Sequence, residues 1–430
     1  MRASTTTDEQ MTARYDSPAL LLSSVRLERF KAAFATGDVE LHPFTVLIGR
    51  NGSGKSTLLE ALQWIDTSVR FDARRACERY YGIRDLVNLR SRTSPPYFQL
   101  TMRWKYAESR VEDDQDKLEI EYRVKVEQDR DGRTPIIVGE WLKWMNSDKF
   151  EWISTKSPRK PRKGERQKST AREPRILFPD TRYQIPFSEP DRLALARGLG
   201  LGRMHRRDPF PEIRDFWERA VFLRLSPNRL VQGSPAKRRS FEPLLDEEGQ
   251  TLPALLRELR KDQMSDLIER IRTILPDIRG IHLERPTAGR DATVSYSLVE
   301  RMPYVGRAGR STFRVPAWML SEGTRRITAI LALLARDPAP SLLCIEEVEN
   351  GLDPWTTLRI LAELQSASDH GVQVLLSSHS IWLLDHVPIQ NVLLVSRVEG
   401  ETLYEQFDKS TRGQQFRGSI PAGTRYVQGG

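Results

Sequence analysis

The hydrophobic pattern of the chain changes period several times, and these changes predict both strands and helices. The apolar run VELHPFTVLIG ends at Gly49, and a glycine-rich turn and a helical pattern follow from about Lys55. Residues 97–106 and 118–127 instead alternate apolar and polar positions. Because side chains of a strand point to opposite faces in turn, this alternation predicts an antiparallel hairpin or meander.

Helical and strand-like patterns continue through the second half of the chain. Residues 252–275 have an apolar face at helical spacing, and residues 280–286 and 292–301 resemble strands. From residue 318 to 400 helices and strands alternate, which predicts a parallel sheet. Residues 156–175 differ, because nine Lys or Arg stand there against two Glu, with three Pro. This composition predicts a loop or tail-like insertion rather than a packed element.

The composition indicates a protein that can bind polyanions. Lys and Arg exceed Asp and Glu by 67 to 58, which gives a net charge of +9 and is compatible with a nucleotide, nucleic acid or anionic membrane partner. The two cysteines, Cys77 and Cys344, are too few for a disulfide framework or a zinc site and suit a reducing cytosol. Neither a signal sequence nor a membrane-spanning stretch is recognisable. We therefore expect a soluble, cytoplasmic protein with no membrane partner.

The glycine-rich turn carries a phosphate-binding motif. The sequence GRNGSGKST fits the pattern G-x-x-x-x-G-K-[ST] between a predicted strand and a predicted helix. Its glycines let backbone N–H groups approach phosphate oxygens, and the helix N-terminus adds its dipole. Lys55 is expected to reach the β- and γ-phosphates, and the hydroxyl of Ser56 to ligate Mg²⁺. The candidate nucleotide contacts are Gly49, Asn51, Gly52, Ser53, Gly54, Lys55, Ser56 and Thr57.

Two adjacent glutamates follow the apolar run SLLCI. A continuous apolar run is typical of a strand in a parallel sheet, and ligands bind beyond the carboxyl ends of such strands. Glu346 and Glu347 are therefore expected beside the phosphate loop. Glu346 is the candidate Mg²⁺ ligand, and Glu347 is placed to orient or deprotonate the water that attacks the γ-phosphate. On their own, the two acids could also be a solvated strand end.

These motifs together resemble those of the ABC-class ATPases. The sequence EEVENGLD is similar to their Walker B motif and D-loop, and VQVLLSSHS resembles the strand that ends at the switch histidine, here His379. His379 lies 32 residues after Glu347. The sequence WMLSEGTRRITAILALL resembles the signature motif and its helix. The form LSEGTRR is similar to the soluble branch that includes SMC, RecF and OLD-type "AAA family" ATPases, and argues against a transporter subunit.

The resemblance implies a mechanism in which two copies of the chain enclose two ATP molecules head to tail. Ser321 and Gly323 of one copy would then contact the γ-phosphate held by the other. Asp353 would couple the two sites, and His379 would contact the γ-phosphate and hold the attacking water. With Lys55 and Glu347, His379 completes the candidate catalytic residues, and ATP and Mg²⁺ are the implied cofactors.

The resemblance also implies a fold and a division of the chain. We expect an α/β P-loop NTPase with an ABC-type ATPase core, in which a mixed sheet accompanies an antiparallel β subdomain and a helical, irregular middle insertion. No Q-loop can be placed, since Gln99, the one candidate, lies within a predicted strand. The expected segments are a disordered N-terminus (1–19), the first half of the core (20–135), the middle insertion (136–314) with its basic loop (156–175) and helical segment (252–275), the second half of the core (315–408) and a C-terminal tail (409–430).

The biological role depends on the partner. Only 51 residues follow His379, which leaves no room for the Toprim nuclease domain of OLD-type proteins, so we expect a separate effector. By family analogy, the protein and this effector would act together in an anti-phage defence module. A second hypothesis is a RecF-like or SMC-like maintenance ATPase that binds nucleic acid through the basic region, although that run could also be a solvated loop. A third is a scaffold that assembles with ATP and hydrolyses it only marginally.

Overall fold

The computed structural model places most of the regions that carry these motifs. It describes residues 20–93, 95–106, 119–129, 134–145, 151–155, 176–177, 182–183, 191–193, 195–197, 210–235, 238–239, 241–284, 293–302, 311–414, 421, 423–424 and 426. The expected N-terminal segment and the basic loop 156–175 lie outside these residues. Within the described residues, no helix is long and apolar enough to cross a membrane.

A six-stranded sheet holds the phosphate loop and the paired glutamates. Its order is β11-β17-β18-β4-β19-β20, with the first five strands parallel and β20 antiparallel at the edge. The strands are β11 (Val221–Leu223), β17 (Leu342–Ile345), β18 (Gln373–Ser378), β4 (Phe44–Ile48), β19 (Val392–Val398) and β20 (Glu401–Gln406). The mixed sheet expected from the sequence is therefore present, and its parallel strands are almost entirely buried, as continuous apolar runs predict.

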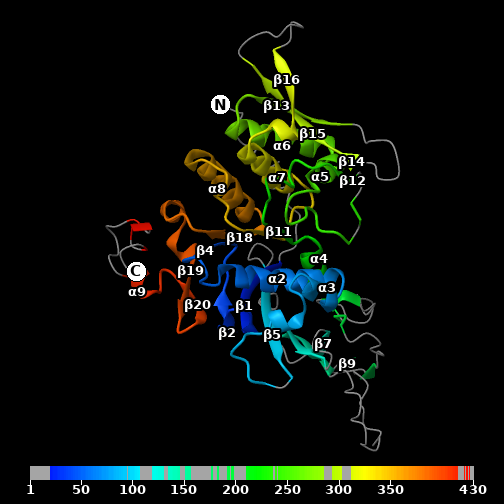
Figure 1. The fold of residues 1–430 in the computed structure, drawn as a ribbon, viewed down its shortest axis with the longest axis vertical. Coiled ribbons are helices and arrows are strands. Elements are labelled where there is room, and N and C mark those ends of the chain that lie inside the picture. Colours follow the sequence, from blue (N-terminus) through cyan, green and yellow to red (C-terminus); the bar gives the residue numbers. More distant parts are fainter. Residues whose placement is uncertain are drawn as a thin grey trace, which may run out of the picture.

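A second sheet is antiparallel and lies below the first in Figure 1. Its order is β2-β1-β5-β6-β7-β8, and β3 also pairs with β1. The predicted hairpin is confirmed, since β5 pairs with β6 from Tyr97 to Trp104. The strands are β1 (Leu20–Phe30), β2 (Ala33–Ala35), β3 (Val39–Glu40), β5 (Tyr97–Tyr106), β6 (Ile120–Gln128), β7 (Pro135–Trp144) and β8 (Glu151–Thr155).

The remaining elements cover the two sheets or form small satellites. The main helices are α2 (Lys55–Arg70), α3 (Ala73–Glu78), α4 (Phe210–Glu218), α5 (Leu252–Glu258), α6 (Lys261–Ile274), α7 (Glu322–Leu334), α8 (Pro354–Asp369) and α9 (Thr411–Gln414). A three-stranded antiparallel sheet contains β13 (Ile278–Leu283), β15 (Tyr296–Arg301) and β16 (Thr312–Pro316). Two short pairs are β9 (Ile176–Leu177) with β10 (Arg182–Tyr183), and β12 (Ser234–Pro235) with β14 (Thr293–Val294).

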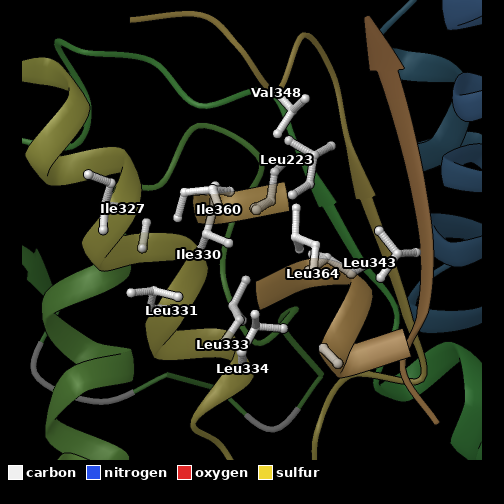
Figure 2. Close-up of a cluster of buried hydrophobic side chains, with 14 of the residues drawn as sticks. Leu223, Ile327, Ile330, Leu331, Leu333, Leu334, Leu343, Val348, Ile360 and Leu364 are labelled. Atoms are coloured by element: carbon white, nitrogen blue, oxygen red, sulfur yellow. The ribbon is translucent and has the colours of Figure 1, made fainter. Parts of the chain in front are cut away.

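Two hydrophobic clusters fix these layers. In the first cluster α2 packs between the sheets, where its Leu62 joins Leu27 of β1 and Leu375 of β18. The second cluster covers the opposite face of the parallel sheet, where α7 and α8 pack against β17 and β18. Figure 2 shows Ile330 of α7 and Ile360 of α8 in this cluster. The apolar runs of the sequence therefore contribute to two hydrophobic cores, one on each side of the parallel sheet.

The range expected as a helical, irregular middle insertion has two features that the sequence did not predict. The helical pattern at 252–275 forms two helices, α5 and α6, which are separated at Leu259 and Arg260. The break occurs because Arg260 has an extended backbone and its N–H donates to Oε1 of Gln263, which starts a new helix. In addition, β7 and β11 belong to the two large sheets, so part of this range is built into the core.

Candidate functional site

The phosphate loop between β4 and α2 adopts a backbone that its glycines permit. Gly52 has φ +75° and Gly54 has φ +110°, which L side chains rarely adopt. A Cβ at Gly54 would lie 2.4 Å from Oγ1 of Thr402, and one at Gly49 would lie 2.2 Å from the carbonyl oxygen of Val395. The loop is thus tightly fitted against β19 and β20, which positions it at the start of α2.

The N-terminus of α2 leaves polar groups available at this loop. Gly54 is the N-cap and provides no side-chain hydrogen bond to the first turn, while the N–H of Thr57 donates to the carbonyl of Gly54 at 3.0 Å. The Oγ of Ser53 is buried and has no hydrogen-bond partner among the described residues. Free N–H groups at a helix N-terminus and an unpaired buried hydroxyl suit a phosphate group.

Lys55 points back into the loop. Its Nζ donates to the carbonyl oxygens of Gly49 at 2.7 Å and Arg50 at 3.2 Å, and it lies 3.3 Å from Nδ1 of His379. Burial lowers the pKa of Lys55, and the nearby carboxylates, of which Glu347 is the first, oppose this effect. A buried lysine with only partial compensation is an electrostatically favourable place for an anion.

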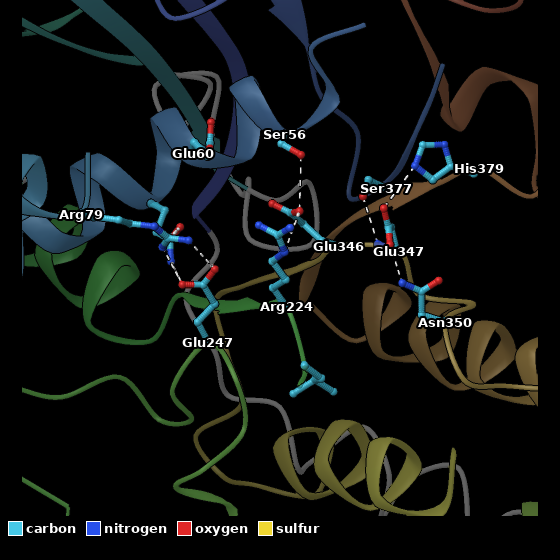
Figure 3. Close-up of polar contacts among 12 residues, drawn as sticks. Ser56, Glu60, Arg79, Arg224, Glu247, Glu346, Glu347, Asn350, Ser377 and His379 are labelled. Carbon is cyan, nitrogen blue, oxygen red and sulfur yellow. Dashed lines mark hydrogen bonds and ion pairs between the residues drawn. The ribbon is translucent and has the colours of Figure 1, made fainter. Parts of the chain in front are cut away.

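Ser56 and Glu346 face each other across the site. The Oγ of Ser56 donates to Oε2 of Glu346 at 3.4 Å (Figure 3). Glu346 follows β17 directly, and Nε of Arg224 lies 3.9 Å from its Oε2. Burial raises the pKa of Glu346 and Arg224 lowers it. A hydroxyl and a carboxylate at this spacing are a suitable pair of ligands for Mg²⁺.

Glu347 has an unusual backbone and well-defined neighbours. Its φ is +50°, which is uncommon for a residue other than glycine and is often found at functional sites. Its N–H donates to Oγ of Ser377 at 3.1 Å, and its carboxylate accepts a hydrogen bond from Nδ2 of Asn350. The other carboxylate oxygen lies 3.2 Å from Nε2 of His379 (Figure 3). The hydrogen bond from Asn350, and after it the proximity of His379, lower the pKa of Glu347.

The signature and D-loop residues form a separate group at two helix N-termini. Ser321 caps α7 by accepting from the N–H of Thr324 at 3.1 Å, and Asp353 caps α8 by accepting from the N–H of Thr356 at 3.0 Å. Gly323 lies against Gly351, because a Cβ there would be 2.8 Å from the carbonyl oxygen of Gly351. Both Ser321 and Asp353 are exposed. The structure thus places Gly323 of the signature against the D-loop and leaves Ser321 and Asp353 exposed.

Three arginines at the site were not predicted from the sequence. Arg79, Arg224 and Arg326 line a cavity of about 590 Å³ beside Glu346 and Glu347. Arg79 forms an ion pair with Glu247, and Arg326 forms one with Glu322 at 3.2 Å. In the sequence, only the apolar triplet of β11 could have indicated the position of Arg224, which follows it directly. If the triplet is a strand of the parallel sheet, Arg224 lies at the same edge of the sheet as the glutamates.

Glu349 also has a role in the site's geometry that its place in the motif did not indicate. Its Oε1 accepts hydrogen bonds from Oγ of Ser378 at 2.9 Å and from the N–H of His379 at 2.7 Å. This carboxylate therefore holds the turn that carries His379. Gln99, by contrast, lies within β5 opposite Lys125, as expected for an ordinary strand residue.

The donor set fits a nucleotide with its metal ion. Among the described residues, no three His, Cys, Asp or Glu side chains gather as a metal site. Ser56 and Glu346 alone leave most positions of an octahedral Mg²⁺ to phosphate oxygens and water, which is how this ion usually binds. The unpaired Ser53 hydroxyl and the crowded backbone at Gly54 are consistent with a phosphate in the loop.

The fold and these motifs define a P-loop protein with an ABC-type ATPase fold. An SMC head solved with the C-winged helix domain of ScpA matches with a TM-score of 0.50 and 15% identity over 89% of this chain and 97% of that chain. The SMC head domain from Thermotoga maritima matches with a TM-score of 0.44 and 15% identity over 90% and 98%. The head domain from Pyrococcus furiosus gives 0.49 and 12% over 90% and 96%.

The chain belongs to the family described as "AAA domain, putative AbiEii toxin, Type IV TA system", which matches residues 44–385. This range extends from β4 through the phosphate loop, the signature and the paired glutamates to His379. A comparison with curated proteins finds no match. The resemblance to the SMC-like and ABC-class ATPases is therefore confirmed at the level of family and fold.

Proposed function

We propose that the protein binds and hydrolyses ATP at this site. The observation that carries the proposal is a continuous chain of contacts. Nζ of Lys55 lies 3.3 Å from Nδ1 of His379, and Nε2 of His379 lies 3.2 Å from Oε1 of Glu347. The Ser56–Glu346 pair lies beside it at 3.4 Å. The five side chains come from two strand ends, those of β17 and β18, and from the start of helix α2, and together they offer the groups that phosphoryl transfer needs.

Each residue then has a distinct task. Lys55 neutralises charge on the β- and γ-phosphates, and the N–H groups of the loop hold their oxygens. Glu347 accepts the proton of the attacking water, which its lowered pKa allows at neutral pH. His379 holds the γ-phosphate and the water in place. Ser56 and Glu346 would hold Mg²⁺, which supplies charge neutralisation to the phosphates when it is bound.

Two copies of the chain complete the site in this proposal. Ser321, Gly323 and Asp353 lie at the N-termini of α7 and α8, and the exposed ends of these helices offer donors to a γ-phosphate held by another copy. Large apolar side chains close to them in the sequence are exposed, with Trp318 at 68% and Trp355 at 49%. Exposed aromatic residues beside a polar site support a protein interface.

Phosphate release from ATP by the purified chain tests this proposal. We expect Glu347→Gln to bind ATP and to hydrolyse it about a hundredfold or more slowly, because a positioned base contributes about that much. Lys55→Ala is expected to lose ATP binding itself. Wild-type turnover in Glu347→Gln would refute the assignment of Glu347 as the base, and absence of turnover in the wild-type chain would favour an ATP-assembled scaffold.

The proposed biological role is control of a partner effector in a toxin–antitoxin or anti-phage defence module. The family description, which refers to a toxin and a Type IV system, supports this direction. One structural relative is an SMC head bound to a domain of another protein, ScpA, which supports a protein partner for this fold. The alternative is a DNA maintenance ATPase, which the net charge of +9 keeps open.

Capture of partners with Glu347→Gln distinguishes these roles. Blocked hydrolysis prolongs the ATP-bound state, so affinity purification from the native host with Mg-ATP should retain whatever that state holds. We expect a toxin-like or nuclease-like protein to co-purify in stoichiometric amount. Lys55→Ala serves as the control, because it cannot form the ATP-bound state. Nucleic acid without a protein partner, released at high salt, would contradict the effector role and support maintenance.

A further inference from the structure

A second cavity, of about 730 Å³, lies at the end of α2 that is remote from the phosphate loop. Arg70 and Phe71 reach it from the C-terminus of α2, which spans 16 residues, so about 24 Å separates it from Lys55. Its volume is in the range of small-molecule sites. The other principal side chains around it are those of Arg75, Arg192, Arg214, Arg239 and Phe241.

The cavity is basic, because five arginines line it against three acids, and two of these acids are in ion pairs. Asp191 forms an ion pair with Arg74 at 3.1 Å, and Glu218 forms one with Arg214 at 2.8 Å. Asp72 caps α3 by accepting a hydrogen bond from the backbone N–H of Arg75. The buried guanidinium of Arg70 pairs with Asp66 at 2.9 Å. What remains is an excess of positive charge that faces solvent.

Two guanidinium groups at the rim have no carboxylate partner within the part of the chain that the structure describes. Arg75 and Arg239 are exposed, and neither forms an ion pair with a described residue. Two guanidinium groups that line a cavity and have no carboxylate partner offer positive charge and several N–H donors to an anionic ligand.

Two aromatic rings line the same cavity as these arginines. The rings of Phe71 and Phe241 meet edge to face with centroids 5.3 Å apart, and the guanidinium of Arg75 lies 3.9 Å above the ring of Phe71. Phe241 is 44% exposed, although a phenylalanine gains by burial. An exposed ring in the same cavity as unpaired arginines is the combination with which proteins bind bases and phosphates together.

We propose that this cavity binds single-stranded nucleic acid, with one unpaired base against Phe241 and the adjacent phosphates on Arg75 and Arg239. The stacking surface accepts any base, so the site discriminates single strands from duplexes rather than one sequence from another. The proposal does not depend on ATP hydrolysis, because the cavity shares only the helix α2 with the phosphate loop.

Binding of a fluorescent oligothymidylate of about 15 nucleotides, measured by anisotropy on the full chain, tests the site. Phe241→Ala should weaken binding about tenfold and leave its salt dependence unchanged, because stacking releases no counterions. Arg75→Ala should weaken binding and reduce the salt slope by about 0.7, the value for one phosphate of a single strand. Melting temperatures should stay at the wild-type value, since both side chains are outside the clusters of the core.

Matched control variants distinguish binding at this cavity from non-specific binding to basic surface residues and from effects of the ATP site. Arg272→Ala removes an exposed arginine of α6, which pairs with Glu269, and should leave binding unchanged. Lys55→Ala should also retain oligonucleotide binding, whatever happens to ATP turnover. Wild-type affinity in both Phe241→Ala and Arg75→Ala would overturn the proposal, as would no binding by the wild-type chain. Equal displacement by uridine monophosphate would assign the cavity to a free nucleotide, and equal displacement by polyglutamate to anions in general.

Discussion

Glu347 is defined by its neighbours as much as by its place in the motif. Its left-handed backbone, with φ +50°, turns it away from the line of β17, while Glu346 continues toward Ser56. Two adjacent carboxylates therefore receive different environments. Burial raises the pKa of Glu346, whereas the hydrogen bond from Asn350 is the main cause that lowers the pKa of Glu347. Divergent environments for paired acids are typical of sites that assign them separate tasks.

The first prediction concerns the hydrogen bond from Asn350. Glu347 acts as a base only when it is ionised, and Asn350→Ala removes the main cause of its lowered pKa. We therefore expect the acid limb of the kcat/KM profile to shift to higher pH, with activity lost first at the acid end. Above pH 8 the rate should stay within about twofold of wild type, because Glu347 is ionised there in both proteins.

A pH profile of ATP turnover from pH 5 to 9 checks this shift. Asn391→Ala is a suitable control, since Asn391 lies in the short 3-10 helix Ile389–Asn391, away from Glu347 in the fold. An acid limb that is identical in Asn350→Ala and wild type would show that Asn350 does not tune the base.

The sequence identified the motif residues but not all of their partners. Lys55, Ser56, Glu346 and Glu347 follow from the phosphate-loop pattern and the apolar strand, His379 follows from the resemblance to ABC-class ATPases, and the structure brings these five together. Arg79 and Arg224 could not be found in this way, because they come from segments with no recognisable motif and reach the site only through the packing of α3 and β11. Local patterns predict which strand end a residue follows, whereas the neighbours of that strand depend on the whole sheet.

At the scale of elements, α2 connects the phosphate loop to the rest of the core. Its N-terminus follows Gly54, and its C-terminus is fixed by Arg70. The guanidinium of Arg70 donates to the carbonyl oxygens of Trp217 at 2.7 Å and Ala220 at 3.1 Å, directly before β11. The helix therefore has a fixed position relative to the strand that carries Arg224.

The second prediction tests the fit of the phosphate loop. Gly54→Ala adds a Cβ at φ +110° and 2.4 Å from Thr402, so the loop must shift and ATP affinity should fall at least about tenfold. Gly37→Ala is the matched control, because Gly37 also has positive φ but nothing within 4 Å of the added Cβ. It should lose only about 1 kcal/mol of stability and bind ATP normally. Titration of a fluorescent ATP analogue against both variants measures the difference, and equal affinities would contradict the crowding argument.

The third prediction concerns the anchor of α2. Asp66 is fully buried, and burial raises its pKa to about 6, so its pair with Arg70 is charged at pH 8. Asp66→Asn leaves the buried guanidinium without its carboxylate and should lower the free energy of unfolding by about 3 to 5 kcal/mol. Glu269→Gln breaks an exposed pair with Arg272 and should cost less than about 1 kcal/mol. Urea unfolding at pH 8 compares them, and equal losses would mean that the Asp66–Arg70 pair does not anchor the helix.

The helical segment 252–275 shows what the hydrophobic pattern leaves out. Its apolar face is continuous, and the pattern therefore predicted one helical segment. The structure has two helices because the Gln263 side chain accepts a hydrogen bond from the backbone N–H of Arg260 and so starts a second one. Periodicity reports which residues are buried, and it does not register a capping hydrogen bond that leaves the apolar face continuous.

At the scale of the whole molecule, the class of fold was predictable from the order of its motifs. A strand, phosphate loop and helix near the start, and alternating helices and strands from 318 to 400, predicted the parallel sheet that β4, β17 and β18 form. The short strand β11 was not predicted, since three residues carry too little pattern. It nevertheless extends the sheet at the edge beside β17.

The arrangement of the site points to a molecule that works as a pair. Lys55, Ser56, Glu346, Glu347 and His379 form one group, and Ser321, Gly323 and Asp353 form another at exposed helix N-termini. If ATP joins the first group of one copy to the second group of another, neither copy has a complete site alone. A composite site predicts that two inactive variants recover activity when they are mixed. A complete site in each chain does not predict this recovery.

Mixing two inactive variants tests it directly. Lys55→Ala lacks the phosphate-loop lysine, and Ser321→Arg blocks the signature surface, so neither should hydrolyse ATP alone. In an equal mixture, half of the pairs contain both variants, and each mixed pair has one intact composite site. Phosphate release should therefore recover to about one quarter of the wild-type rate for a symmetric two-site pair. Activity of Ser321→Arg alone at the wild-type rate, or no recovery in the mixture, would contradict the composite site.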